Sequence, residues 1–406
     1  MNRRIKHTSP SAAPEFYFVN KFHWPTETPM VYVSTMSTYA LAQAGCTMTL
    51  IGSGDPQHDI DRELRKSFSL RPLPHYTIKL FSKMRINRRK KLTLLFYARA
   101  AWYILTSSRS QPVIISRNTT FLAWLWLLKF LTGAKALFET HGYHGKKTLP
   151  DLPARGKRKF GNVSFYYMVL ERIILNRLDG VICITHPQQD IYRADFVRVP
   201  SIVLPVGAPL SPDEKIDTHQ AFDRRCVVFI GRDTSNADGE VLLKACSLCK
   251  PDGIRFAWIG LNDAARAKLE IELERKAIAD HFILQSWMTP RQLREYIISN
   301  ASAGIAAYKP GYRSEVVTSP TKIFDYFALG LPVVAAKMPT TTSIMSDGNE
   351  GVFYHPGDPQ SLASAIRKVL AAKSPYKSMS AQALCAAEHY SYASRARRLI
   401  SFAGGL

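Results

Sequence analysis

The segment from Ser319 to Ala336, "SPTKIFDYFALGLPVVAA", carries two residues whose types and spacing suit ligand chemistry. Lys322 and Asp325 lie one helical turn apart, so on a helix their side chains project from the same face. An ammonium group can bind phosphate oxygens, and a carboxylate can accept hydrogen bonds from hydroxyl groups. The alternative interpretation is an exposed ion pair that stabilises a helix by about 0.2–0.5 kcal/mol.

The residues around this pair predict a short helix and a buried strand. Ser319 can cap the helix N-terminus, Pro320 suits its first position, and Gly330 suits a left-handed C-terminal cap. The apolar stripe of the helix consists of Ile323, Phe324 and Phe327. A helix N-terminus carries positive partial charge and free N–H groups. We therefore expect the main chain at Thr318 and Ser319 to receive phosphate or sugar oxygens.

Other candidates stand where predicted strands end. Gly231 and Arg232 follow an apolar run; the glycine allows close backbone approach, and the planar guanidinium suits a diphosphate. His141 follows another run, in "ETHGYHG", and either contacts a substrate or caps a neighbouring backbone. The weaker candidates at these positions are Arg117, Glu139 and His144.

Strand and helix patterns alternate along the chain, which predicts parallel sheets with helices on both faces. One series of strands is expected at residues 15–20, 46–52, 111–117, 134–140, 180–185 and 202–207, and a second at 226–231, 255–260, 281–286, 302–307 and 331–336. A Pro- and Gly-rich break near residue 208 separates them. Ligands of such sheets bind at the carboxyl ends of the strands.

The pattern therefore predicts an α/β protein with two Rossmann-like, doubly wound domains that face a cleft. Residues 1–207 form the first domain, and residues 208–385 form the second. The C-terminal helix, at 386–406, is expected to pack back on the first domain.

The net charge of +22 is concentrated in the first half of the chain. Residues 1–200 hold 30 Lys and Arg against 12 Asp and Glu, and residues 64–138 contain no acidic residue. The segment "RRKKLTLLFYARAAWYIL" leads from basic residues into an aromatic-rich helical pattern, which favours contact with an anionic membrane surface. A solvated basic face and nucleic-acid binding are the alternatives, although no nucleic-acid-binding motif accompanies the charge.

Targeting and cysteine chemistry are not indicated. The N-terminal "MNRRIKHTSPSAAPEF" lacks the apolar centre of a signal peptide, and no charge-free apolar run reaches the roughly 18 residues of a membrane span. Cys246 and Cys249 form one CxxC without a second ligand pair, which is typical of an apolar helix rather than a zinc site.

"SPTKIFDYFALGLPVVAA", followed by "DGNEGVFYHPGDPQSLASAIRKVL", resembles the donor-domain signature of the family-4 glycosyltransferases. "VVFIGR" resembles the start of that family's second domain. "YALAQAGCTMTLIG", "ALFETHG", "LDGVICIT" and "IVLPVGAPL" resemble its first domain in the same order. The similarity runs from about residue 15 to residue 372. It implies a GT-B fold and a retaining enzyme that uses nucleotide sugars.

The resemblance also implies roles for residues on the donor side. Asp325 matches the second acid of the family's motif of two Glu residues separated by seven, which binds the ribose hydroxyls of the donor. The first acid is replaced by Val317, so sugar contacts are expected from the main chain at Thr318 and Ser319, or from Glu315.

Further roles concern the diphosphate and the acceptor. Arg232 matches the family's diphosphate arginine, whereas the lysine six positions later is Asp238, and Lys322 is expected to substitute for it. His141 matches a histidine near the reacting sugar. "NKFHWPTETPM" stands in place of the glycine-rich loop that follows the family's first strand, which leaves the acceptor contacts open.

These observations predict a retaining hexosyltransferase that moves a sugar from a nucleotide-diphosphate sugar to a lipid-linked or cell-envelope polysaccharide acceptor. His141, Arg232 and Lys322 are the expected catalytic residues, with protein cations and a helix dipole stabilising the leaving diphosphate. No cofactor and no metal are expected. The predicted location is cytoplasmic, peripheral on the inner face of the cell membrane. The alternatives are a GT-B nucleotide-sugar-binding subunit without turnover, favoured by Val317 and Asp238, and a basic nucleic-acid-binding protein.

Overall fold

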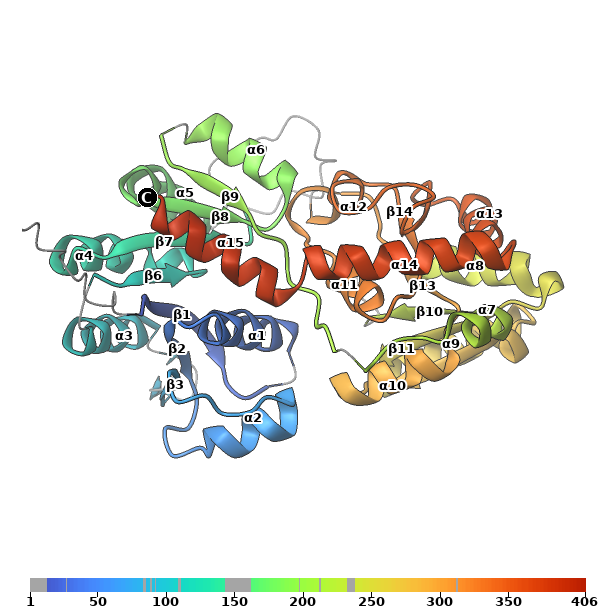
Figure 1. Ribbon diagram of the computed structural model, residues 1–406, viewed down its shortest axis with the longest axis horizontal. Coiled ribbons are helices and arrows are strands. Elements are labelled where there is room, and N and C mark those ends of the chain that lie inside the picture. Colours follow the sequence, from blue (N-terminus) through green and yellow to red (C-terminus); the bar gives the residue numbers. More distant parts are fainter. Residues whose placement is uncertain are drawn as a thin grey trace, which may run out of the picture.

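The computed structural model describes residues 13–26, 28–82, 85–87, 90–91, 93–108, 111–142, 162–196, 198–211, 213–231, 238–311 and 313–406. Their helices and strands form two domains that lie side by side, each built around one parallel sheet (Figure 1). This arrangement confirms the doubly wound α/β organisation that the alternation of strand and helix patterns predicts.

The first domain contains, in the described part of the chain, a seven-stranded sheet of order β3-β2-β1-β6-β7-β8-β9 with parallel neighbours throughout. Its strands are β1 (Glu15–His23), β2 (Thr47–Ser53), β3 (Tyr76–Phe81), β6 (Val113–Ser116), β7 (Lys135–Thr140), β8 (Gly180–Cys183) and β9 (Ser201–Val203). Its helices are α1 (Pro29–Gln43), α2 (Ile60–Phe68), α3 (Thr93–Ser107), α4 (Leu122–Thr132), α5 (Asn162–Ile174) and α6 (His186–Asp195). Strands β4 (Arg85–Asn87) and β5 (Lys90–Lys91) form a separate antiparallel pair.

Both faces of this sheet are buried. Alternate residues of a strand point to opposite faces, so the two sets of residues enter different cores. Phe16 and Phe18 of β1 pack into one hydrophobic core, and Tyr17 and Val19 pack into the other. This double burial explains why the strands of the sequence read as nearly continuous apolar runs.

The second domain contains, within the described residues, a six-stranded parallel sheet of order β12-β11-β10-β13-β14-β15. Its strands are β10 (Cys226–Ile230), β11 (Arg255–Leu261), β12 (Phe282–Ser286), β13 (Ala303–Ala306), β14 (Val333–Ala336) and β15 (Gly351–Tyr354). Its helices are α7 (Thr218–Arg224), α8 (Gly239–Cys249), α9 (Asp263–Arg275), α10 (Pro290–Asn300), α11 (Thr321–Ala328), α12 (Pro339–Thr342), α13 (Pro359–Val369) and α14 (Lys373–His389). Cys246 and Cys249 are both buried on α8.

The chain passes from the first domain to the second through residues 204–217, and it returns with the last helix, α15 (Tyr392–Gly404) (Figure 1). Helix α15 packs against α1 of the first domain. The Lys135 ammonium donates to the Ala403 carbonyl oxygen at 2.8 Å, and the Arg398 guanidinium donates to the Val203 carbonyl oxygen at 2.9 Å. The C-terminal helix therefore belongs structurally to the first domain.

The described residues include no helix that combines the length and the apolar character needed to cross a bilayer.

Candidate functional site

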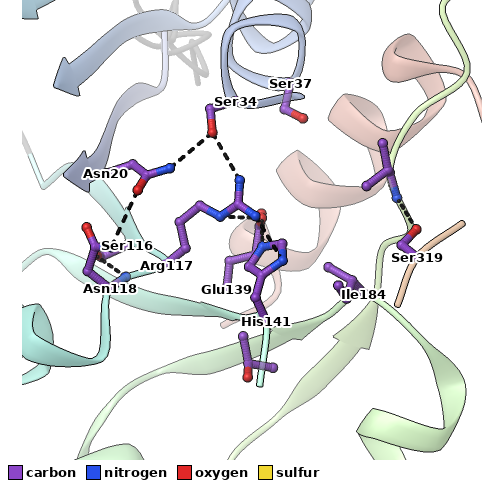
Figure 2. Close-up of polar contacts among 12 residues, drawn as sticks. Asn20, Ser34, Ser37, Ser116, Arg117, Asn118, Glu139, His141, Ile184 and Ser319 are labelled. Carbon is purple, nitrogen blue, oxygen red and sulfur yellow. Dashed lines mark hydrogen bonds and ion pairs between the residues drawn. The ribbon is translucent and has the colours of Figure 1, made fainter. Parts of the chain in front are cut away.

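Polar side chains gather at the carboxyl end of the first sheet. Asn20 lies within β1, Arg117 directly follows β6, and Glu139 lies within β7. The parallel register of these strands places the three residues side by side. Asn20 Nδ2 and Arg117 Nη1 both donate to Ser34 Oγ of helix α1, at 3.2 and 3.1 Å (Figure 2). The register of the sheet therefore builds a polar cluster out of residues far apart in the sequence.

The Glu139 carboxylate lies at the centre of this cluster and is 4% exposed. Its Oε2 lies 2.6 Å from Arg395 Nη2 of helix α15, and its Oε1 lies 2.8 Å from His141 Nε2 and 3.7 Å from Arg117 Nε. Burial by itself would raise the pKa of Glu139, but the charge of Arg395, the hydrogen bond from His141 and the charge of Arg117 together hold that pKa well below its usual range. Glu139 is therefore ionised at neutral pH.

Both ring nitrogens of His141 are occupied by protein groups (Figure 2). Arg117 Nη2 lies 2.8 Å from Nδ1, and because arginine is only a donor, Nδ1 must be the unprotonated acceptor. Nε2 then carries the proton and donates to Glu139. Burial, helped by the charge of Arg117, lowers the pKa of His141 to about 4. His141 is thus a neutral imidazole that cannot take a proton from a substrate in this arrangement.

On the other domain, close packing fixes helix α11 against the sheet. The Tyr326 hydroxyl donates to the Val228 carbonyl oxygen at 2.9 Å and accepts from the Ile230 N–H at 3.1 Å. The ring lies over Gly304, where an added Cβ would come within 2.3 Å of it. Only glycine at position 304 allows this approach, and the approach determines where the preceding turn of α11, with Lys322, meets the end of β10.

The Lys322 ammonium lies at the carboxyl end of β10. It is 4.0 Å from the centre of the Phe229 ring and 4.7 Å from that of Tyr308, and a Cβ added to Gly231 would be 3.4 Å from it. Burial lowers the pKa of Lys322 to about 7, although the charge of Asp325 acts in the opposite direction. Aromatic rings attract a cation, but they do not replace the oxygen partners that it loses on leaving water.

The Asp325 carboxylate faces the first domain. Burial raises the pKa of Asp325 to about 7, against the charges of Arg294 and Lys322. The pKa of Tyr32, on α1, is raised by burial and by the charge of Asp325. The pKa of Tyr392, on α15, is raised by burial, by Tyr32 and by the charge of Asp325. Asp325 is therefore close to helices of the other domain.

Neither Lys322 nor Asp325 takes part in the ion pairs within 4.0 Å that the described residues form. Both side chains are half-buried, so the exposed-ion-pair interpretation of their spacing does not describe this structure. A cation and an anion withdrawn from water without close partners are costly, and a bound ligand that supplies the partners would offset the cost.

This pair predicts a characteristic pH dependence of stability. Asp325 has a higher pKa in the folded protein than its ordinary 3.8, so its stabilising contribution is lost as the pH rises through 7. Lys322 has a lower pKa than its ordinary 10.5, so its contribution is lost as the pH falls through 10.5 towards 7. The urea midpoint of the ligand-free protein, compared with that of the Lys322→Met/Asp325→Asn variant, should be lowest near pH 7. A pH-independent difference between the two proteins would contradict the assignment.

Comparison with known proteins identifies the second domain. Residues 224–372 match the sequence model of the family Glycosyl transferases group 1. The match lies within the second domain, which is therefore similar to the corresponding domain of that family. A search of curated proteins by sequence gave no match.

Solved structures share the two-domain architecture of this chain. HepE of Anabaena, solved in complex with UDP-glucose, is 13% identical with a TM-score of 0.66, over 97% of this chain and 100% of that one. Sucrose-phosphate synthase of Thermosynechococcus elongatus is 17% identical with a TM-score of 0.67, over 96% and 98%. TarM of S. aureus, solved in a complex that includes UDP, is 12% identical with a TM-score of 0.65, over 96% and 99%. The fold is the predicted GT-B arrangement.

The start of helix α11 differs from the prediction. Helix α11 begins at Thr321 with Pro320 at the N-cap position, and Ser319 does not cap it. Instead Ser319 Oγ accepts a hydrogen bond from the Val206 N–H at 3.0 Å (Figure 2). The connection between the domains runs beside this helix, and its buried N–H group needs an acceptor. Thr318 Oγ1 donates to the Arg313 carbonyl oxygen at 2.6 Å, so its hydroxyl supports the preceding turn.

The remaining predicted residues are placed as follows. Gly231 has a φ of 152°, and its carbonyl oxygen accepts from Trp258 Nε1 at 2.7 Å. Arg232 lies outside the described residues, as does His144. Asp238 is buried at the N-cap of α8, where its side chain makes no capping hydrogen bond. Lys322 and Gly231 are thus brought together, and Asp325 lies on the same helix, whereas His141 belongs to the cluster on the other domain.

The π-helical turn Arg313–Val317 occupies the place of the family's first acid. Glu315 Oε1 accepts from the Gly311 N–H at 3.3 Å, and the Val316 carbonyl oxygen accepts from the Thr185 hydroxyl of the first domain. Thr340 Oγ1 donates to the Ser314 carbonyl oxygen at 2.5 Å. The turn therefore bridges the two domains beside the start of α11.

Sequence reasoning missed Arg395, which holds Glu139. A signal was present: the buried residues of α15 recur at helical spacing, and Arg395 occupies one of the positions on this stripe. The other buried members are Tyr392, Ala396, Leu399 and Ala403. A charged residue at such a position implies a buried partner of opposite charge.

Proposed function

We propose that this protein transfers a sugar from a nucleoside-diphosphate sugar to an acceptor at the carboxyl end of the first sheet. The observation that carries the proposal is the pair of half-buried charges, Lys322 and Asp325, which lack close protein partners where the domains meet. Lys322 would bind the diphosphate beside Gly231, and Asp325 would accept hydrogen bonds from the ribose hydroxyls. One helix would then hold both parts of the donor.

The chemistry follows from the charge that develops during transfer. The bond between the anomeric carbon and the diphosphate oxygen breaks, and negative charge accumulates on the leaving group. The acceptor hydroxyl oxygen forms the new bond to the anomeric carbon, and its proton passes to the departing phosphate oxygen. Lys322, once protonated, stabilises this charge from a position fixed before the reaction, which is electrostatic catalysis by a preorganised group.

His141 has a supporting role in this proposal. Its ring nitrogens are committed to Arg117 and Glu139, so a base role would require the Arg117 contact to break. We therefore propose that the cluster of Arg117, Glu139 and His141 shapes the sugar and acceptor side as a rigid polar surface. The proposal also includes retention of configuration and transfer without a metal ion. It includes a lipid-linked or cell-envelope acceptor, with the protein peripheral on the inner face of the membrane.

The experiment that tests the proposal is a thermal-shift panel of UDP, GDP, UDP-glucose and GDP-mannose. A ligand that binds only the folded protein raises the melting temperature. At one hundred times its Kd, it adds about 2.7 kcal/mol to the free energy of unfolding. At least one nucleotide should stabilise the protein, and Asp325→Asn should weaken that effect. Absence of any shift across the panel would contradict donor binding.

The second candidate function is a donor-binding subunit without activity, which is favoured by Val317 in place of an acid. A measurement of turnover distinguishes it from the transferase. Slow release of free sugar from a labelled donor, at a rate above the uncatalysed one, is the expected result. Donor binding without any release, in the presence of glycan and lipid extracts as acceptors, would favour the binding subunit.

A further inference from the structure

Helices α3 and α4 of the first domain present large apolar side chains to solvent. The exposed fraction reaches 67% for Trp102 and 80% for Phe130. The apolar face that they form consists of Trp102, Leu105, Trp126, Leu127, Phe130 and Leu131. Monomeric soluble proteins rarely expose so many large apolar residues together, so we expect this face to contact a partner.

The composition of α4 makes the same point. Leu122, Leu125 and Leu128 form its buried stripe, and the opposite side is also apolar apart from Lys129, which pairs with Asp179 at 2.8 Å. A helix that is apolar all round is normally buried or in contact with lipid, and this one is covered on one side only. Between α3 and α4 runs an open groove of about 630 Å³ lined by residues that include Trp102, Trp124 and Leu131.

The charges bordering the apolar face are positive. Lys79 lies 5.3 Å from the centre of the Tyr103 ring at the groove, and Arg99 lies 5.7 Å from that of Phe81. In the sequence, residues 83–91 carry six Lys and Arg directly before α3, and residues 64–138 carry no acid. Apolar and aromatic side chains surrounded by cations complement the acyl chains and headgroups of an anionic bilayer.

The position of the face in the fold suits such a partner. Figure 1 shows α3 and α4 at the end of the first domain that lies away from the second domain. Strand β3 has its carboxyl end at Phe81, and the carboxyl end of the same parallel sheet carries Asn20, Arg117 and Glu139. A bilayer on this flank would leave the second domain uncovered (Figure 1).

We propose that the apolar face of α3 and α4, with its basic border, is the docking surface for an anionic lipid bilayer. The purpose of this docking rests on the proposed function, because a lipid-linked acceptor lies in a bilayer. Binding of the protein to lipid does not itself require sugar transfer. Trp102 and Phe130 insert at the level of the acyl chains, and the basic side chains contact lipid phosphates.

Vesicle sedimentation tests this directly. The wild-type protein should sediment with phosphatidylcholine vesicles containing about 30% phosphatidylglycerol, and much less with phosphatidylcholine alone or in 0.5 M NaCl, because salt screens the basic border. Trp102→Ser/Phe130→Ser should bind the anionic vesicles about 10-fold more weakly. The matched control is Leu248→Ser/Ile271→Ser, which removes two exposed apolar residues of the second domain and should bind like wild type.

Three results would overturn the inference. They are equal vesicle binding by Trp102→Ser/Phe130→Ser and the wild type, no binding of the wild type to anionic vesicles, and binding of a protein or an oligonucleotide to this face without any binding of lipid. Quenching of wild-type tryptophan fluorescence by brominated lipid provides a readout that needs no variant, and it should occur only with anionic vesicles. The nucleotide thermal shift should be the same in both double variants and in wild type. Absence of vesicle binding together with a normal nucleotide thermal shift would contradict the docking surface but not the proposed sugar transfer. Absence of the thermal shift together with normal vesicle binding would contradict the sugar transfer but not the docking surface.

Discussion

The Lys322→Met protein is expected to bind UDP-glucose or GDP-mannose, whichever the wild type binds, at least about 100-fold more weakly, and to lose sugar release by a factor of about 100–1000. The ammonium lies beside Gly231 with two aromatic rings as its neighbours, and a diphosphate would be its anionic partner. Methionine keeps a similar length and packs against the same rings, but it carries no charge.

The same substitution should not destabilise the ligand-free protein. Burial lowers the pKa of Lys322, which means that the fold disfavours the charged form at this position. A neutral side chain is expected to leave the melting temperature unchanged or to raise it, the usual trade between stability and function. Lys268→Met, on the exposed face of α9, is the matched control and should change neither quantity. Undiminished donor affinity of Lys322→Met would refute the role of this lysine.

The largest effect on stability is expected for Arg395→Met. Its guanidinium lies 2.6 Å from Glu139, donates to the Leu204 carbonyl oxygen at 3.0 Å, and is buried. Removing one partner of a buried ion pair leaves the other charge uncompensated, which costs about 3–5 kcal/mol. Arg117 remains near Glu139, so we expect the lower end of this range, measured as the free energy of unfolding in urea.

Two comparisons sharpen the test of Arg395. Arg397→Met, two residues further along α15 and exposed, should cost less than about 0.5 kcal/mol. Glu139→Gln/Arg395→Met should cost less than the sum of the two single variants, because both remove the same interaction. Additive losses, or a loss below about 1 kcal/mol for Arg395→Met, would show that the ion pair does not hold α15 on the first domain.

The parallel sheets could be predicted because most of their strands are buried on both faces and therefore read as apolar runs. Helix α2, strand β3 and strand β15 were missed. Strands β3 and β15 are edge strands, which have only one neighbour, and β3 includes the polar residues Thr77 and Lys79 within "YTIKLF". Helix α2 is mostly charged, with Leu64 and Phe68 as its buried residues. Such elements form through tertiary packing that a local pattern does not encode.

The candidate site was only partly predictable. The spacing of Lys322 and Asp325 correctly placed both on one helix, but their half-buried, unpaired state depends on Tyr308, Phe229 and the neighbouring domain. The cap predicted at Ser319 failed because a residue 113 positions away, Val206, competes for its hydroxyl. Such long-range partners follow from the fold, and a local pattern does not contain them.

The most direct test of donor binding by Lys322 and Asp325 is the number of protons exchanged when UDP-glucose or GDP-mannose binds, measured by calorimetry in buffers of different ionisation enthalpy. At pH 8 about one proton should be taken up, because Lys322, with a pKa of about 7, must become charged to hold the diphosphate. At pH 6 a proton should be released, because Asp325 must ionise to accept the ribose hydroxyls. Absence of proton uptake at pH 8 or of proton release at pH 6, or an unchanged uptake at pH 8 in Lys322→Met, would contradict the account.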